Sequence, residues 1–351
     1  MSIRANDLIF LLGAGCSYDA GVPITSRMIE LIETDLLSKK PWNKYKELYY
    51  YIKSSIVYAD GILGVYSPNI NIERFVNTLS ELHKQERHSL YPFISNWDQR
   101  LIRLAGTNFE HVQELKELIV KQVVSWIKVD NYQQKADYYK KFYDFQNELQ
   151  MPCRVFSLNY DLCLERIKPE AAILETGFDP DSRKWNASRF EENDVLSVNI
   201  YLYKLHGSID WKRNIQLGYI LTVSDNPEDE PDLIFGTDVK LQPIDPYLFY
   251  VHQFREYSLS CKLIIVIGYS FGDNYINGLL KQALDHDKNR RILYITPNSS
   301  ETSDRMAQKL EVTNSSARIQ CLPLSAKDFL ENHFSLNTIE KYMPSGASDV
   351  F

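Results

Sequence analysis

Residues 8–17 read LIFLLGAGCS, and this stretch is the strongest indication of the fold. Its first part, LIFLL, is continuously apolar and stops at Gly13, which is typical of a strand buried on both faces of a parallel sheet. Apolar residues then recur at helical spacing over residues 28–37. We therefore expect a strand, a glycine turn and a helix in that order, which is half of a nucleotide-binding unit.

The second half of the chain repeats this alternation. Short apolar runs, each typical of a strand, occur at 153–158, 201–205, 262–267, 291–295 and 318–324. Helical patterns occur at 160–167, 246–259, 273–285, 301–310 and 325–333. Strands that alternate with helices predict crossover units, so we expect an α/β fold with a Rossmann-like, doubly wound, mainly parallel sheet.

Residues 41–150 differ from this pattern and predict a large helical insertion. Their long amphipathic stretches at 72–85, 112–127 and 136–149 have no alternating strands between them. We therefore expect three parts, which are a Rossmann-like domain, a helical insertion and a C-terminal tail. They span 1–40 with 151–335, 41–150, and 336–351.

Composition excludes several classes of protein. The 351 residues carry 39 Lys and Arg against 46 Asp and Glu, a net charge of −7, so the basic excess typical of nucleic-acid binding is absent. The five cysteines are scattered without a CxxC pair, which argues against a disulfide framework and against a zinc site, and no metal is expected. The apolar run before Gly13 is too short for a signal peptide or a membrane span, so we expect a soluble, cytoplasmic protein. We interpret the acidic stretch at 224–232 as a solvated loop, with a carboxylate metal site as the alternative.

The glycine turn at residues 13–17 is a candidate phosphate site. Gly13 and Gly15 leave room at the start of a helix, where backbone N–H groups can bind a pyrophosphate. The alternative is a tight turn without a ligand. The dehydrogenase fingerprint GxGxxG needs a glycine where this chain has Tyr18, so an ordinary hydride-transfer enzyme is disfavoured.

Three further motifs follow predicted strands: SLNYD at 157–161, KLHGS at 204–208 and GYSFGD at 268–273. Because the carboxyl ends of parallel strands meet at one edge of a sheet, their polar side chains should lie at the same crevice. Each also has a structural interpretation. Asn159 and Ser270 suit helix caps, Asp161 suits a first helical turn, and His206 suits a hydrogen-bonded structural position.

Taken together, GAGCSYDAGVP, SLNYD, LHGS and GYSFGD resemble the SIR2-like, sirtuin-related NAD-binding family, in its zinc-less bacterial branch that includes anti-phage NAD hydrolases. The resemblance implies NAD⁺ as the substrate and three groups of contacts along it. It assigns the pyrophosphate and adjacent ribose to Gly13, Ala14, Gly15 and Ser17. It assigns the nicotinamide ribose and carboxamide to Asn159 and Asp161, catalysis to His206 together with Asn159, and the adenosine ribose to Gly268, Ser270 and Asn298.

The chain departs from the protein deacetylases of that family. It lacks their two CxxC pairs, and where they carry GIPDFR it reads GVPITSR, with Arg27 one place too late. The zinc module helps to shape the acetyl-lysine groove in those relatives, so water is the expected acceptor. The expected activity is hydrolysis of NAD⁺ to nicotinamide and ADP-ribose. The alternatives are a non-catalytic subunit that senses NAD or ADP-ribose and an NAD-dependent protein deacylase.

The resemblance also implies control by assembly, because an NAD hydrolase that is always active would deplete the cell. We expect a homo-oligomer or a complex with a HerA-type ATPase, acting in anti-phage defence. Aromatic residues, which are enriched at interface cores, are frequent in the insertion: Tyr49, Tyr50, Tyr51, Tyr138, Tyr139, Phe142, Tyr143 and Phe145. The alternative is that these rings fill the insertion's own core.

Overall fold

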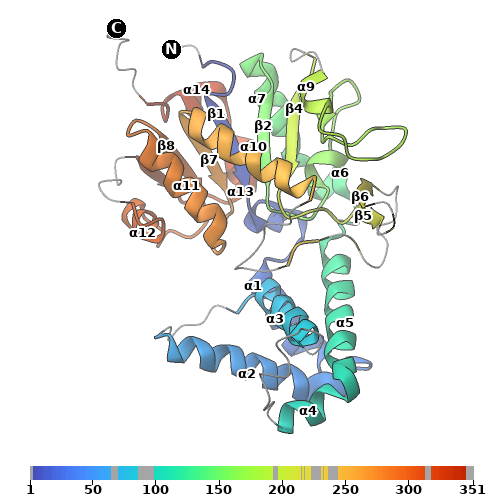
Figure 1. The fold of residues 1–351 in the computed structure, drawn as a ribbon. Coiled ribbons are helices and arrows are strands. Elements are labelled where there is room, and N and C mark those ends of the chain that lie inside the picture. Colours follow the sequence, from blue (N-terminus) through green and yellow to red (C-terminus); the bar gives the residue numbers. More distant parts are fainter. Residues whose placement is uncertain are drawn as a thin grey trace. The chain divides into compact units, whose positions relative to one another are not determined.

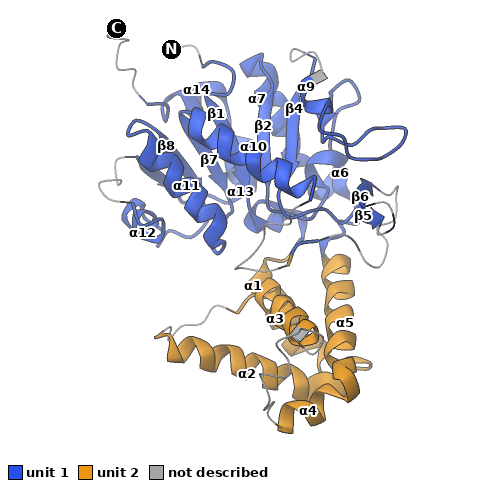
Figure 2. Ribbon diagram, viewed as in Figure 1, with its two compact units in different colours: residues 1–22, 127–234, 238–351 blue, residues 23–126, 235–237 orange. Residues whose placement is uncertain are grey.

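A computed structural model describes residues 3–64, 70–85, 99–192, 197–214, 216, 218–222, 231, 233–235, 244–312 and 318–344 (Figure 1). The chain forms two compact units (Figure 2). Unit 1 comprises residues 1–22, 127–234 and 238–351, and unit 2 comprises residues 23–126 and 235–237. The expected insertion at 41–150 therefore overlaps unit 2 between residues 41 and 126.

Unit 1 is built on a seven-stranded sheet in the order β3-β4-β2-β1-β7-β8-β9, in which every neighbouring pair is parallel. The strands are β1 (Leu8–Leu12), β2 (Cys153–Ser157), β3 (Leu174–Glu175), β4 (Ile200–Lys204), β7 (Leu263–Ile267), β8 (Arg291–Ile295) and β9 (Ile319–Leu322). The predicted α/β fold with a doubly wound parallel sheet is confirmed. A separate antiparallel hairpin joins β5 (Trp211–Asn214) to β6 (Tyr219–Thr222).

Helices cover both faces of this sheet (Figure 1). The helices of unit 1 are α6 (Tyr132–Lys135), α7 (Lys141–Leu149), α8 (Cys163–Arg166), α9 (Arg189–Glu192), α10 (Tyr247–Ser260), α11 (Asn274–His286), α12 (Ser303–Lys309), α13 (Ala326–Asp328) and α14 (Leu336–Glu340). Short 3₁₀ or π turns occur at Ala14–Ala20, Asp137–Lys140 and Phe329–His333. The helix α14 falls within the expected C-terminal tail, and most of the acidic stretch at 224–232 lies outside the described residues.

Strand β1 is apolar at every position because all of its side chains are buried. Ile9 and Leu11 belong to a core that also contains residues of α10 and α11, whereas Phe10 points to the opposite face because side chains alternate along a strand. There its ring has three phenylalanine neighbours with centroids at 5.4, 5.8 and 5.5 Å, which are Phe142, Phe145 and Phe334. Both faces of the strand are therefore buried, as predicted.

Unit 2 is helical, with α1 (Thr25–Leu31), α2 (Lys46–Ile62), α3 (Ile72–Gln85), α4 (Gln99–Ala105) and α5 (Glu110–Ile127), the last residue of which belongs to unit 1. Short 3₁₀ or π turns occur at Ile32–Leu36, Trp42–Tyr45 and Thr107–Phe109. The amphipathic stretches predicted at 72–85 and 112–127 correspond to α3 and α5. In this unit the ring of Tyr49 is buried and packs against Phe75, with the centroids 4.6 Å apart.

Most of the aromatic residues considered for an interface are buried within the chain. Of the eight, six have almost no exposed surface: Tyr49, Tyr138, Tyr139, Phe142, Tyr143 and Phe145. For these six, the expectation of an exposed contact surface is wrong. Tyr49 fills the core of unit 2, whereas the other five lie in unit 1, where Phe142 and Phe145 pack against Phe10 of β1. The alternative that the rings fill the core of the helical insertion therefore holds within unit 2 for Tyr49 alone. Tyr50 is exposed and Tyr51 is half-buried.

Two glycine loops pack backbone against backbone where β1 and β7 end. Gly13 N donates a hydrogen bond to Ile267 O at 2.9 Å, and Gly15 N donates to Gly268 O at 2.8 Å. A Cβ on Gly13 would lie 2.5 Å from Tyr269 Cα, and one on Gly15 would lie 2.9 Å from Gly268 Cα. Glycine is therefore required here because the two main chains approach more closely than any side chain allows.

Substitution of Gly268 should test this contact. Its φ of +65° is left-handed, and a Cβ there would lie 2.3 Å from Cys16 N, so Gly268→Ala should lower the free energy of unfolding by more than about 2 kcal/mol. Gly278 is the matched control, because it is exposed within α11 and a Cβ added there would have no neighbour within 4 Å. Gly278→Ala should raise stability by roughly 0.5–1 kcal/mol. Urea unfolding of both variants measures the difference, and equal stability of the two would contradict the packing argument.

Candidate functional site

The sheet order places the predicted motifs at a topological switch point. From β1 the chain builds β2, β4 and β3 on one side, and then β7, β8 and β9 on the other. In sheets of this kind, ligands bind beyond the carboxyl ends of the strands at the point where the order reverses, which here is between β1 and β7. The five groups of predicted site residues follow the carboxyl ends of β1, β2, β4, β7 and β8.

The hydroxyl of Ser17 lies at the centre of a buried hydrogen-bond network. It donates to Asp161 Oδ2 at 2.6 Å and accepts from Asn159 Nδ2 at 3.1 Å. Because its one hydrogen goes to the carboxylate, the contact of 2.7 Å with Tyr139 must have the phenol as the donor. Ser17 has no exposed surface, and its hydrogen-bonding capacity is filled by three protein side chains.

The same network orients the side chain of Asn159. Its Nδ2 donates to Gly13 O at 2.9 Å as well as to Ser17 Oγ, and both of these partners require a donor. The position of the amide nitrogen is thereby determined, and no described residue donates to Asn159 Oδ1. The carbonyl oxygen is therefore the atom of this side chain that is left to accept a hydrogen bond from a ligand.

Asp161 is held on both of its carboxylate oxygens. Oδ2 accepts from Ser17, and Oδ1 accepts from Cys163 N at 3.0 Å, at the start of α8. The residue is 5% exposed. Its predicted contact with a nicotinamide carboxamide stays a prediction, and in this structure the carboxylate orients Ser17.

His206 lies beside Asn159 in the register of the sheet. Ser157 of β2 pairs with Lys204 of β4, so Asn159 and His206 each lie two residues beyond a paired position on neighbouring strands. Adjacent strands are about 4.8 Å apart, and Leu205 N still donates to Ser157 O beyond the end of β4. The two predicted catalytic residues therefore leave the sheet side by side.

The partner of His206 is a residue to which sequence reasoning gave no role. His206 Nε2 lies 3.1 Å from Asp273 Oδ2, and both side chains are buried. Asp273 is the last residue of the GYSFGD motif. In the sequence it shows only as an Asp at the start of a helical pattern, which is typical of a helix N-cap. It is also the N-cap of α11, where its Oδ1 accepts from Tyr275 N and Ile276 N.

Tyr139 is the second residue that sequence reasoning missed. It lies in the short 3₁₀ turn before α7, 122 positions away from Ser17 along the chain. Burial holds the pKa of its hydroxyl well above the ordinary value, so it remains a proton donor to Ser17. Its surroundings in the sequence show only a helical pattern of aromatic residues, which carries no signal for this contact.

Ser270 and Asn298 lie at the exposed rim of this edge. Asn298 Oδ1 accepts from Ser300 N at 3.1 Å and from Ser300 Oγ at 2.8 Å, so the side chain forms a local turn. The predicted roles of these two residues and of Gly268 at an adenosine ribose stay predictions, as does the pyrophosphate role of residues 13–17.

An ion pair between the buried Lys204 and the half-buried Glu165 adjoins this network. Lys204 Nζ lies 3.2 Å from Glu165 Oε1 and also donates to Asp161 O. Burial raises the pKa of Glu165 to about 7, although the charge of Lys204 opposes this. Burial lowers the pKa of Lys204, but the carboxylates of Glu165, Asp161 and Asp210 outweigh this effect, so its pKa is raised and it stays charged.

The described part of the chain contains no cluster of three or more His, Cys, Asp or Glu side chains that could hold a metal ion. All five cysteines are free. Within the same described ranges, no helix is both long enough and apolar enough to span a membrane.

Comparisons with known proteins agree with the fold. Residues 154–316 match the family model described as a SIR2-like domain. This segment contains Asn159, Asp161, His206, Gly268 and Asn298, and it begins after the glycine turn at residues 13–17. No curated protein matches the chain.

Several solved structures are similar to the chain at low identity. A Sir2 homologue in complex with NAD is 13% identical, with 95% of this chain and 90% of that chain covered and a TM-score of 0.45. A mutant Sir2 homologue in complex with ADP-ribose is 14% identical, with 95% and 92% covered and a TM-score of 0.46.

The ion pair generates a prediction on pH. The pKa of Glu165 is raised from 4.5 to about 7 in the folded chain, so its contribution to stability is complete below pH 4.5 and is lost as the pH rises through 7. In Glu165→Gln, the free energy of unfolding should fall less between pH 5 and pH 8, by up to about 3 kcal/mol, because the group that titrates is gone. Urea unfolding across this pH range measures the change. Glu170→Gln, which removes an exposed negative charge, is the control, and identical pH dependence of wild type and Glu165→Gln would contradict the assignment.

Proposed function

We propose that this chain is an NAD⁺ hydrolase that cleaves NAD⁺ with water to nicotinamide, ADP-ribose and a proton. The observation that carries the proposal is that Asn159, with its amide oriented by Ser17 and Gly13, and His206 follow the carboxyl ends of the neighbouring strands β2 and β4. The match of residues 154–316 to a SIR2-like domain supports the same reaction class.

The reaction requires stabilisation of an oxocarbenium-like ribose while a neutral nicotinamide leaves. A carbonyl oxygen suits this task because it accepts hydrogen bonds from ribose hydroxyls or water without a change of charge. Asn159 Oδ1 is such an atom, and its position is determined by both of its amide hydrogens. Orientation of this kind lowers the barrier because the entropy of alignment is lost on binding and not in the transition state.

His206 is the proton acceptor of the proposed reaction. An imidazole has an ordinary pKa near about 6.5 and can take a proton from water or a ribose hydroxyl at neutral pH. Asp161 would contact the nicotinamide carboxamide. Ser17 would act indirectly, through its hydrogen bonds to Asn159 and Asp161. The backbone of Gly13, Ala14 and Gly15 would lie along the pyrophosphate.

At the opposite end of the substrate, Gly268, Ser270 and Asn298 would contact the adenosine ribose. Ser270 and Asn298 are exposed, and Gly268 is half-buried. Water as the acceptor distinguishes the proposal from protein deacylation.

The proposed biological role is depletion of NAD⁺ in anti-phage defence, with activity controlled by assembly of the chain with itself or with a HerA-type ATPase. The free cysteines support a reducing cytoplasm as its compartment. For self-assembly, the surface of unit 2 offers apolar side chains on α2 that are strongly exposed: Tyr58 at 72%, Ile62 at 69% and Leu63, just beyond its end, at 79%.

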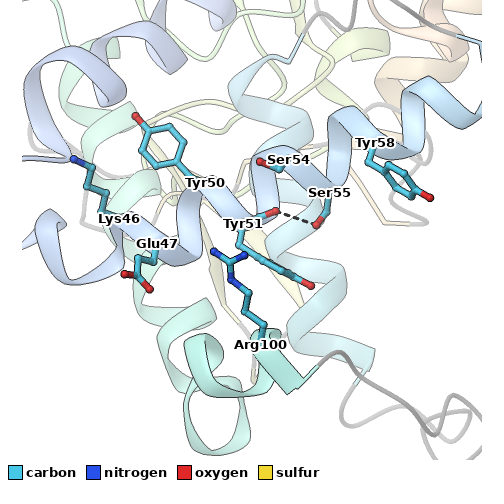
Figure 3. Close-up of a pocket in the computed structure, with 8 residues that line it drawn as sticks. All are labelled: Lys46, Glu47, Tyr50, Tyr51, Ser54, Ser55, Tyr58 and Arg100. Atoms are coloured by element: carbon cyan, nitrogen blue, oxygen red, sulfur yellow. Dashed lines mark hydrogen bonds between the residues drawn. The ribbon is translucent and has the colours of Figure 1, made fainter.

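A hollow of about 620 Å³ lies along this same helix (Figure 3). Tyr50, Tyr51 and Tyr58 line it from α2, and Arg100 of α4 reaches over the ring of Tyr51, with 5.6 Å from its Cζ to the ring centroid. Exposed aromatic side chains beside an arginine are typical of interface cores. We assign the contact between copies of the chain to this face of α2.

The site assignment predicts the effect of two substitutions. Asn159→Ala and His206→Ala should each lower the rate of nicotinamide release from NAD⁺ by roughly 10²- to 10⁴-fold, because orientation or proton transfer is lost. Asn147→Ala and His286→Ala change the same residue types at exposed positions and should leave the rate unchanged. Chromatographic detection of nicotinamide, with circular dichroism as a check on folding, measures the effect. Full activity in both site variants would refute the assignment, and binding of NAD⁺ without cleavage by the wild type would favour the sensor.

The assembly assignment predicts a loss of association. Tyr58→Glu combined with Tyr50→Glu should weaken self-association at least tenfold, because two charges would have to be buried in the contact. Leu248→Glu removes an exposed apolar side chain from unit 1 and should leave association unchanged. Light scattering over a concentration series gives the result. A wild-type chain that stays monomeric at every concentration, and is fully active, would argue against control by self-assembly.

A further inference from the structure

Asp273 connects two loops that are far apart in the sheet. His206 follows β4 and Asp273 follows β7, and the strands β2 and β1 lie between those two in the sheet order. The loops that carry His206 and Asp273 must therefore together span the carboxyl ends of both intervening strands, and the hydrogen bond of 3.1 Å from His206 Nε2 to Asp273 Oδ2 joins them. A buried polar contact in this position needs an explanation beyond strand pairing.

We propose that Asp273 is a positioning residue that fixes the tautomer of His206 and offsets the positive charge that His206 acquires when it takes a proton. This inference rests on the proposed NAD⁺ hydrolase function. An ionised carboxylate can only accept hydrogen bonds, so the shared proton belongs to Nε2, and Nδ1 is the nitrogen that takes the proton from water or a ribose hydroxyl. The resulting imidazolium lies against a negative charge in a buried place, where that attraction is strong.

The surroundings hold this carboxylate in one orientation. Its Oδ1 caps α11, and Asp273 N donates to the hydroxyl of Tyr269 at 3.1 Å. The Tyr269 hydroxyl donates in turn to Asn277 Oδ1 at 2.9 Å, and Asn277 Nδ2 donates to Phe271 O at 2.9 Å. The loop from Tyr269 to Asn277 is thus closed on itself, and only Oδ2 is directed at the imidazole.

Among the described residues, two tyrosines lie next to this pair. The ring of Tyr160 lies 6.4 Å from the ring of His206 between centroids, and Tyr269 contacts Asp273 through its hydroxyl. A phenol has an ordinary pKa near about 10, so the carboxylate is the partner that changes the imidazole near neutral pH.

The variant Asp273→Asn separates positioning from structure. An asparagine keeps the Oδ1 that caps α11, since Asn is as good an N-cap as Asp. It replaces Oδ2 with an amide that donates, which forces Nε2 to accept and moves the imidazole proton to Nδ1. The helix is preserved, whereas the base has the wrong tautomer and no negative neighbour.

We expect kcat/KM for NAD⁺ hydrolysis by Asp273→Asn to fall roughly 10²- to 10⁴-fold, mainly through kcat, as for other buried carboxylates that orient a histidine base. A second readout is the pKa of His206, followed by NMR of its ring Cε1–H signal. Loss of the neighbouring carboxylate should lower this pKa by about one unit or more. A purely structural role would not move it.

Thr302→Ala is the control for loss of stability. It removes the side chain that caps α12 in the same unit, and it should cost about 1 kcal/mol of stability with kcat/KM unchanged. Unchanged kcat/KM in Asp273→Asn, or an unchanged His206 pKa, overturns the inference. A wild-type chain that releases no nicotinamide overturns the proposed function, and the shift of the His206 pKa then decides separately whether Asp273 sets the imidazole.

Discussion

The contact between the two glycine loops is the constraint on which the rest of the site depends. Gly13 and Gly15 at the end of β1 lie against Gly268 at the end of β7, at distances that exclude a Cβ on any of the three. These loops leave β1 and β7, the two strands between which the sheet order reverses, so their contact fixes the two loops against each other at the switch point. The carbonyl oxygen of Gly13 also accepts a hydrogen bond from Asn159 Nδ2.

From that contact the polar network spreads through Ser17. One hydroxyl with one hydrogen and two acceptor sites joins Asp161, Asn159 and Tyr139, and every group in this chain of bonds has a defined donor or acceptor role. Fully satisfied buried networks are rigid, because each member would lose its partner if it moved. The result is an oriented accepting atom, Asn159 Oδ1, at the end of the strand that pairs with the strand before His206.

The family match covers most of the candidate site but not its glycine turn. The SIR2-like match begins at residue 154, after the glycine turn, and ends at residue 316. The hydrogen bonds of Asn159 tie the matched segment to that turn. The helices of unit 2 lie outside the match, and α2 carries strongly exposed apolar side chains.

Local patterns in the sequence predict the α/β class, the buried strand at residues 8–12 and the principal strands and helices of unit 1. They also place Asn159, Asp161 and His206 at strand ends. These features depend on periodicity and on local turn chemistry, which involve residues that are close together in the sequence. The sequence did not predict the two-residue strand β3 or the hairpin β5–β6, because a strand of two residues shows no period and the segment WKRN has a single apolar residue. Other contacts appear only in the folded chain. Tyr139 hydrogen-bonds to Ser17 across 122 positions, and Asp273 lies within hydrogen-bond distance of His206 across 67. Most of the aromatic residues near residue 140 are buried against β1 and its neighbours. Such contacts depend on the sheet order and on which face each element covers, and no local pattern encodes either.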